Sequence, residues 1–300
     1  MSRTMPPPPL RPSDDRTRLA RSYYYCEHLA RREAGNFYHA FRLLPRDQRR
    51  AMCALYAFMR VADDLADEPG DAQAKRAALA DWRQQLHEAL AGHCRHRLHP
   101  ALHDTVARHR IPAAYLLDVL DGVVMDLDVT RYESFADLYR YCYRVASAVG
   151  LTCIHVWGFT DPKAKEYAEA AGIAFQLTNI LRDLREDAER GRCYLPAEDL
   201  ARFGYGFDAL RRGERTAAYQ ALMRFEAERA RGYYRAAEPL AGLLPAPGRA
   251  VFLVMLRTYR GLLDEIVRRD YDVFAGRVRL GTWRKLWLVA RALPVRWGWA

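Results

Sequence analysis

Two aspartate-rich segments carry residue types and spacings that could support chemistry. The first is YAFMRVADDLADE at residues 56–68. Residues four apart lie on the same face of a helix, so Tyr56, Arg60, Asp63, Asp64 and Asp67 form a polar stripe along an otherwise apolar segment. Asp63 and Asp67 are one turn apart, and both carboxylates can therefore reach a single hard cation.

The second segment is QLTNILRDLREDAERGRCYLP at residues 176–196. Asn179, Asp183 and Asp187 follow one another at intervals of four residues, and Gln176 precedes them by about a turn. The candidate ligands are all oxygens, with no histidine or cysteine among them. This donor set favours Mg²⁺, or Mn²⁺, over zinc.

Either segment alone is weak evidence for a site, because acidic residues on a helix usually form a solvated face. Two such segments in one apolar chain are harder to explain. Carboxylates that face a core repel one another and cost roughly several kcal/mol to desolvate unless a cation compensates.

A carboxylate-bridged di-iron site is excluded because it requires Glu-x-x-His pairs, which this sequence lacks. Mg²⁺ bound by few carboxylates completes its shell with water and phosphate oxygens, so two facing clusters predict a diphosphate site beside an apolar pocket.

Helical periodicity dominates the elements that must position these residues, and no alternating run predicts a sheet. Breakers such as Pro45, Pro112 and Pro162 separate the expected helices. We expect an all-α, single-domain fold over residues 16–300 after a disordered, proline-rich leader at residues 1–15. The expected helices are 16–33, 47–67, 73–91, 99–110, 113–127, 134–158, 162–188, 215–243, 247–274 and 282–293.

The composition limits the partners and the compartment. The net charge of +10 indicates an anionic partner, and the absence of a nucleic-acid motif favours a phosphate-bearing substrate over nucleic acid. Six cysteines without a CxxC pair indicate a reducing cytoplasm. The longest apolar stretch, residues 145–159, falls short of the ~18 residues of a spanning helix. The basic C-terminal segment has two possible roles: it could contact a membrane peripherally, or it could be a plain packed terminal helix. This segment contains Trp283, Trp287, Trp297 and Trp299.

The chain resembles the squalene/phytoene synthases in several blocks at preserved spacing. These blocks are NFYHAFRLLPRDQRRAMCALYAFMRVADDLADE, MDLDVTRYESFADLYRYCYRVASAVGL, GIAFQLTNILRDLREDAERGRCYLPAEDLARFG and LLDEIVRRDYDVFAGRVRL. The resemblance covers roughly residues 20–293. It implies the class I isoprenoid synthase fold, a helical bundle around a central apolar cavity, and head-to-head coupling of two prenyl diphosphates with Mg²⁺.

The resemblance also implies roles for individual residues. Arg60 and Arg277 would contact diphosphate, Gln176 would lie beside the second cluster, and residues 191–196 would form a flap over the metal site. Asn36 and Phe37 occupy a substrate-binding segment in which the family commonly has serine before the aromatic residue, and asparagine can still donate a hydrogen bond. Tyr56, Tyr141 and Tyr259 would line the reaction centre. The implied metal ligands are Asp63, Asp64, Asp67, Asn179, Asp183 and Asp187.

The amino-acid sequence of the segments MDLDVTRYESF and RVASAVGLTCIHVWGF resembles the presqualene diphosphate branch of the family. It therefore favours two farnesyl diphosphates as substrates and presqualene diphosphate as product. NADPH would be required only if the reaction continued to squalene. The alternative is a phytoene synthase that joins two geranylgeranyl diphosphates. A non-catalytic assembly factor of the same fold is a further alternative, but such a protein would be expected to lose the metal ligands that both segments retain.

Overall fold

The computed structural model describes residues 12–298, apart from the side chains of residues 12–14, 36–37 and 282–286. Every regular element in this range is helical, and an isolated bridge joins Arg131 to Cys193. The all-α prediction is therefore confirmed. In chain order the elements are α1 (Pro12–Glu33), α2 (Asn36–Phe41), α3 (Arg46–Asp67), α4 (Ala72–Leu90), α5 (His99–His109), α6 (Ala113–Asp128), α7 (Phe135–Cys142), η1 (Tyr143–Ser147), α8 (Ala148–Trp157), α9 (Ala164–Glu189), α10 (Ala197–Arg202), α11 (Phe207–Arg211), α12 (Ala217–Ala237), α13 (Leu240–Leu243), α14 (Ala246–Arg268) and α15 (Thr282–Arg296).

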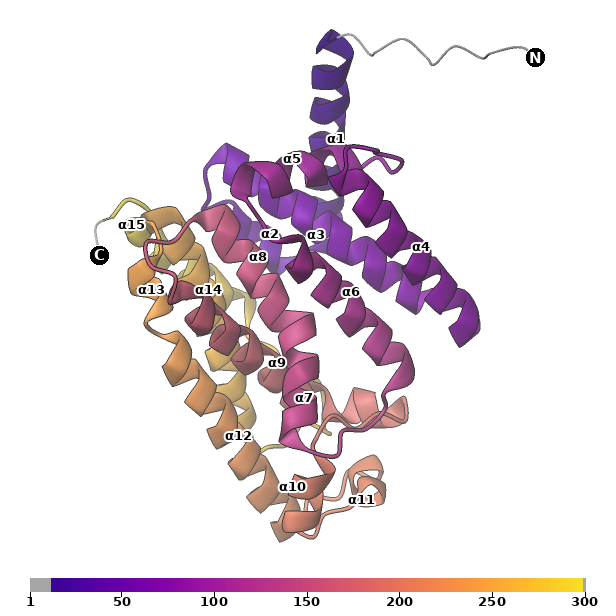
Figure 1. The fold of residues 1–300 in the computed structure, drawn as a ribbon. Helices are drawn as coiled ribbons and strands as arrows, with labels where there is room; N and C mark the ends of the chain where they lie inside the picture. Colours follow the sequence, from indigo (N-terminus) through magenta and orange to yellow (C-terminus); the bar gives the residue numbers. More distant parts are fainter. Residues whose placement is uncertain (1–11, 299–300) are drawn as a thin grey trace, which may run out of the picture.

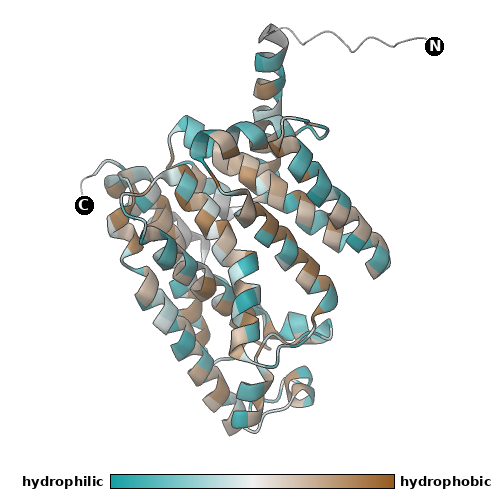
Figure 2. Ribbon diagram, in the orientation of Figure 1, coloured by the Kyte–Doolittle hydropathy of each residue, from teal (hydrophilic) through white to brown (hydrophobic). Residues whose placement is uncertain are grey.

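The two helices that carry the aspartate segments lie at the centre of the packing. Helix α3 packs against α1, α4, α5, α6 and α8, while α9 packs against α7, α8, α12 and α14 (Figure 1). Apolar and polar residues are interspersed along the helices, as expected when each helix buries one face (Figure 2). Side-chain caps fix several helix starts. Ser134 and Asp137 form a capping box at α7, and Asp71 and Thr216 accept backbone N–H groups at the starts of α4 and α12.

The observed helices differ from the expected ones mainly where the chain turns. Helix α1 begins at Pro12, inside the expected leader, whose residues 1–11 lie outside the described range. The expected helix at 215–243 is split at Pro239, and the one at 247–274 ends at Arg268. The short helices α2, α10 and α11 were not expected, because five or six residues are too few to show a periodic pattern.

A π-helical turn, η1, interrupts the expected helix at 134–158. It lies where two glycines allow close helix packing. A Cβ on Gly172 of α9 would lie 2.4 Å from the Cα of Ser147, and one on Gly122 of α6 would lie 2.7 Å from a methyl group of Val145. The extra residue of a π turn changes the register of the helix that follows. Tyr141 before the turn and Val149 after it both line the central cavity.

No helix among residues 12–298 combines the length and apolar character needed to cross a bilayer.

A buried histidine makes the stability of this fold depend on pH. His99 is 1% exposed, its Nδ1 accepts the backbone N–H of His96, and burial lowers its pKa to about 4. In the unfolded chain the pKa returns to its ordinary value near 6.5. Between these values the unfolded chain binds more protons, so the free energy of unfolding should fall by about 1–3 kcal/mol as the pH drops from 6.5 to 4.

Urea unfolding across this pH range measures the effect. His99→Gln keeps the acceptor but cannot titrate, and it should flatten the pH dependence. His93→Gln, at an exposed position, is the matched control. An equal slope in His99→Gln and wild type would contradict the assignment.

Candidate active site

The carboxylates of both aspartate segments meet across a polar mouth of about 320 Å³. Helix α3 contributes Arg60, Asp63 and Asp67, and α9 contributes the second group from the opposite side. Asp126 of α6 and Tyr141 of α7 complete the ring, and the segment after α9 adds Arg190, Arg192 and Tyr194. The residues from α9 are Gln176, Asn179, Asp183 and Asp187. The structure thus brings together most of the residues that the sequence singled out.

A second, apolar cavity of about 440 Å³ continues from this mouth into the bundle. The mouth and the cavity are continuous, because both are bordered by the same five residues: Arg60, Asp63, Asp126, Tyr141 and Gln176. Along α3 the lining extends from Asp63 back to Met52, a distance of about 16 Å at 1.5 Å per residue. The lining also includes the aromatic and aliphatic side chains of Phe41, Trp157, Leu240 and Phe252.

The carboxylates of the mouth carry negative charge that the protein only partly compensates. Asp63 can be reached from the mouth, but protein surrounds it on the other sides, and desolvation raises its pKa to about 6. Desolvation and the neighbouring Asp183 raise the pKa of Asp187 to about 7. Desolvation also raises the pKa of Asp126, although two tyrosine hydroxyls oppose this shift. The raised pKa values indicate that these carboxylates lack sufficient positive charge nearby.

The oxygen atoms of the mouth suit a hard divalent cation. The buried Oδ1 of Asn179 has no hydrogen-bond partner, and it lies on the same helix face as Asp183. A buried oxygen without a partner costs free energy unless a ligand satisfies it. Within the described residues, no three His, Cys, Asp or Glu side chains converge closely enough to hold a metal ion by themselves. The arrangement therefore fits an ion that takes part of its shell from water and substrate phosphate.

Two carboxylates are already paired with arginines. Asp183 accepts hydrogen bonds from the neighbouring Arg182, with Nε at 2.8 Å, and from Arg277, with Nε at 3.1 Å and Nη2 at 3.3 Å. Asp64 faces Arg60, whose Nη2 lies 2.7 Å from Oδ1, and Asp64 is not part of the mouth lining. The Nε of Arg60 is buried without a partner, which leaves a donor for an anionic ligand.

Tyr141 and the segment at residues 191–196 were expected at the site, but Asp126 was missed, although the segment MDLDVTRYESF contains this aspartate. Its Oδ2 accepts the hydroxyl of Tyr141 at 3.1 Å, and its Oδ1 accepts the hydroxyl of Tyr194 at 2.9 Å. The rings of Tyr141 and Tyr194 stack at 5.2 Å, and Tyr132 packs against both. The only sequence signal was a pair of aspartates at the end of an apolar helix.

The segment at residues 191–196 crosses the edge of the mouth. The N–H of Cys193 donates to the carbonyl of Thr130 at 2.8 Å, and Nη2 of Arg192 donates to the carbonyl of Asp126 at 2.9 Å. These bonds connect the segment after α9 with the one after α6. Arg192 and Tyr194 consequently face the carboxylates.

The other expected site residues differ in their placement. Tyr56 lines the apolar cavity. Tyr259 is not among the residues that line the cavity or the mouth. Its ring stacks on the cavity residue Phe175 at 4.5 Å, and its hydroxyl lies at the side chain of the mouth residue Asn179. The side chains of Asn36 and Phe37 lie outside the described residues, although their backbone begins α2.

The family is decided by comparison with known proteins. A family model described as squalene/phytoene synthase matches residues 30–284. The chain belongs to the squalene/phytoene synthase family. It is therefore a prenyltransferase, and the alternative of a non-catalytic assembly factor is not supported.

Relatives within the family share most of their length with this chain. The 15-cis-phytoene synthase of Synechococcus elongatus is 40% identical over 290 residues, covering 93% of this chain and 94% of the relative. The phytoene synthase of Arthrospira platensis is 39% identical over 278 residues, covering 88% of this chain and 90% of the relative. A dehydrosqualene synthase crystallised with a ligand superposes with a TM-score of 0.83 at 29% identity, covering 93% and 98%. The squalene synthase HpnC from Alicyclobacillus acidocaldarius superposes with a TM-score of 0.80 at 27% identity, covering 87% of this chain and 97% of HpnC.

In this synthase, the uncompensated charge of the mouth should lower the stability of the fold, although the carboxylates are needed for function. With metal removed by EDTA at pH 7, Asp187→Asn should raise the free energy of unfolding by about 1–2 kcal/mol. The folded pKa near 7 exceeds the ordinary value near 4, so the ionised form destabilises the fold and its loss is favourable. Asp47→Asn, at the exposed start of α3, is the control. A loss of stability in Asp187→Asn, measured by urea unfolding, would show that Asp187 is compensated within the protein.

Proposed function

We propose that this protein is a Mg²⁺-dependent phytoene synthase that condenses two geranylgeranyl diphosphates head to head. The observation that carries the proposal is the polar, carboxylate-lined mouth that opens directly into a long apolar cavity. The 37–40% identity to proteins named phytoene synthase supports the C20 substrate. This revises the sequence-based expectation of two farnesyl diphosphates. Phytoene formation involves no reduction, so the proposed reaction does not need the NADPH that squalene would require.

The candidate metal ligands are Asp63, Asp67, Asn179, Asp183 and Asp187, with Asp126 facing them. Mg²⁺, or Mn²⁺, bound there would neutralise the charge that develops on the departing diphosphate. Arg60 lines this mouth, and Arg277 contacts the mouth residue Asp183 although it does not itself line the mouth; both would supply donors for diphosphate oxygens. Because Arg60 is paired with Asp64 and Arg277 with Asp183, diphosphate binding would exchange these pairs for new ones.

The apolar cavity would hold the prenyl tails and exclude water from the allylic cation that forms when diphosphate leaves. The aromatic faces of Tyr56 and Phe175 border this space and can stabilise positive charge. Burial raises the pKa of Tyr141 well above its ordinary value, so its hydroxyl stays protonated and acts as a donor to Asp126. We therefore assign the final proton to the released diphosphate rather than to this tyrosine.

Product analysis tests the proposal directly. The protein is incubated with Mg²⁺ and either the C15 or the C20 diphosphate, with and without NADPH, and the products are extracted. Phytoene should form from the C20 substrate without NADPH. Presqualene diphosphate or squalene from the C15 substrate as the preferred product would instead restore the farnesyl alternative, and no product from either would contradict the prenyl synthase assignment of the site.

Asp63→Ala and Asp183→Ala should each lower turnover by at least about 100-fold while the far-ultraviolet dichroism stays helical. Asp47→Ala, on the same helix as Asp63 but at its exposed start, is the control and should keep turnover near wild type. Near-normal activity in either site variant would contradict the metal-ligand assignment.

The C-terminal helix supports the expectation of peripheral membrane contact. Trp287 and Trp297 are 54% and 58% exposed, and the guanidinium of Arg291 lies over the ring of Trp287 at 4.7 Å. Exposed tryptophan beside arginine is typical of a membrane interface. The side chain of Trp283 and the whole of Trp299 lie outside the described residues.

Sedimentation with vesicles that contain anionic lipid tests this contact. Replacing Trp287 and Trp297 together by alanine should reduce the bound fraction several-fold, because the exposed apolar area is lost. Tyr24→Ala removes a 72% exposed ring at the other end of the chain and is the control. Equal binding by the tryptophan variant and the wild type would exclude this surface.

A further inference from the structure

The loop at residues 270–277, which follows α14, begins in a strained conformation. Asp270 and Tyr271 have φ angles of 51° and 58°. These values lie in the left-handed region, which non-glycine residues rarely adopt, and here two successive residues adopt it. Such conformations persist only where the surrounding structure enforces them, and they cluster at functional sites.

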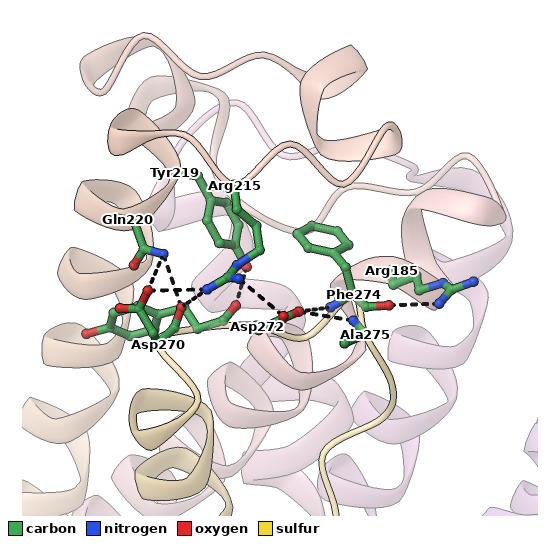
Figure 3. Close-up of polar contacts among 9 residues, drawn as sticks. Arg185, Arg215, Tyr219, Gln220, Asp270, Asp272, Phe274 and Ala275 are labelled. Carbon is green, nitrogen blue, oxygen red and sulfur yellow. Dashed lines mark hydrogen bonds and ion pairs between the residues drawn. The ribbon is translucent and has the colours of Figure 1, made fainter.

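Three side chains from the start of α12 enforce this conformation (Figure 3). Arg215 donates from Nη2 to the carbonyl of Asp270 at 2.7 Å and to its carboxylate at 3.3 Å, and from Nη1 to Asp272 at 3.2 Å. Gln220 donates from Nε2 to the same carbonyl at 3.1 Å and to the same carboxylate at 3.0 Å.

The third side chain, Tyr219, donates its buried hydroxyl to the carbonyl of Tyr271 at 2.7 Å. Both carbonyls of the strained pair are therefore held from α12.

The middle of the loop is attached to α9. Asp272 accepts the backbone N–H groups of Phe274 and Ala275 at 3.2 and 3.0 Å, which closes a turn. Arg185 of α9 donates to the carbonyl of Phe274 at 2.8 Å (Figure 3). Arg185 lies two residues after Asp183, so this bond brings the loop to the second aspartate segment.

The loop ends at Arg277, whose guanidinium contacts Asp183 and lies 3.6 Å from Glu186. The side chain of Arg277 is 41% exposed, whereas the adjacent Val278 is buried, so packing fixes the backbone here and the guanidinium is held mainly by its ion pairs. Three residues span at most about 10 Å, and the attachment at Phe274 therefore confines Arg277 to the neighbourhood of Asp183.

We propose that Arg215 is a positioning residue, which acts with Gln220 to hold the strained start of the 270–277 loop and so places Arg277 at the diphosphate end of the site. This inference rests on the proposed function, because it assigns Arg277 to diphosphate. Arg215 itself touches neither the mouth nor the cavity lining. Its effect on ligand binding must therefore pass through Arg277, whereas a general role in folding would not depend on Arg277.

A double-mutant cycle separates the two roles. The dissociation constant of inorganic diphosphate in the presence of Mg²⁺ is measured by calorimetry for wild type, Arg215→Gln, Arg277→Gln and the double variant. Arg215→Gln should weaken binding by about 5- to 20-fold, and it should have little further effect once Arg277 is already replaced. Arg260→Gln removes an arginine that pairs with Glu238 at 2.6 Å away from the loop, and it should leave the constant unchanged.

Gln220→Met, which keeps side-chain length on a half-buried helical position, is the milder second variant if Arg215→Gln lowers thermal stability too far. It should weaken binding by a smaller factor, again only when Arg277 is present. Unchanged binding in both single variants, or an equal loss with and without Arg277, would overturn the positioning role while leaving the proposed function intact. Failure of the wild type to bind diphosphate with Mg²⁺ would overturn both.

Discussion

The concentration of carboxylates at one end of the bundle is the constraint on which the rest of the structure depends. Five aspartates from three helices border one mouth of about 320 Å³, namely Asp63, Asp67, Asp126, Asp183 and Asp187. Their mutual repulsion and partial desolvation oppose folding, as the raised pKa values of Asp63 and Asp187 indicate. The fold must therefore be held against this repulsion by the apolar packing around α3 and α9.

The arginines around the mouth complement this charge without abolishing it. Asp183 is paired with Arg182 and Arg277, and Asp64 is paired with Arg60, so part of the charge is balanced before ligand arrives. A metal–diphosphate complex would supply both signs at once, because the cation would satisfy carboxylates and the phosphates would satisfy arginines. This explains why a chain with a net charge of +10 contains an acidic site.

The sequence predicted those features that depend on spacing within one helix. The four-residue intervals of Asp63 and Asp67, and of Asn179, Asp183 and Asp187, fixed their shared faces, and the structure places these faces opposite each other. Asp126 could not be recognised in this way, because its partners Tyr141 and Tyr194 lie 15 and 68 residues away. The resemblance implied Tyr259 at the reaction centre, and its place beside Phe175 and Asn179 depends on the packing of α14 against α9.

The ends of elements and the choice of substrate depend on long-range packing. The π turn at residues 143–147 lies in close contact with glycines on two other helices, a contact that the local sequence does not show. The strained pair Asp270–Tyr271 depends on Arg215, which is more than 50 residues away. The cavity wall includes side chains such as Phe41, Trp157 and Phe252, which come from separate helices and meet only in the folded chain, so the space left for a substrate cannot be predicted from local sequence.

Mn²⁺ binding followed by electron paramagnetic resonance tests the central claim most directly, because it asks whether the carboxylate mouth and diphosphate hold the cation together. The account predicts weak binding of Mn²⁺ to the protein alone, and tight binding after inorganic diphosphate is added. This tight binding should be lost in both Asp63→Ala and Asp183→Ala, since the two helices share the site. Tight binding without diphosphate, or binding that survives either substitution, would contradict it.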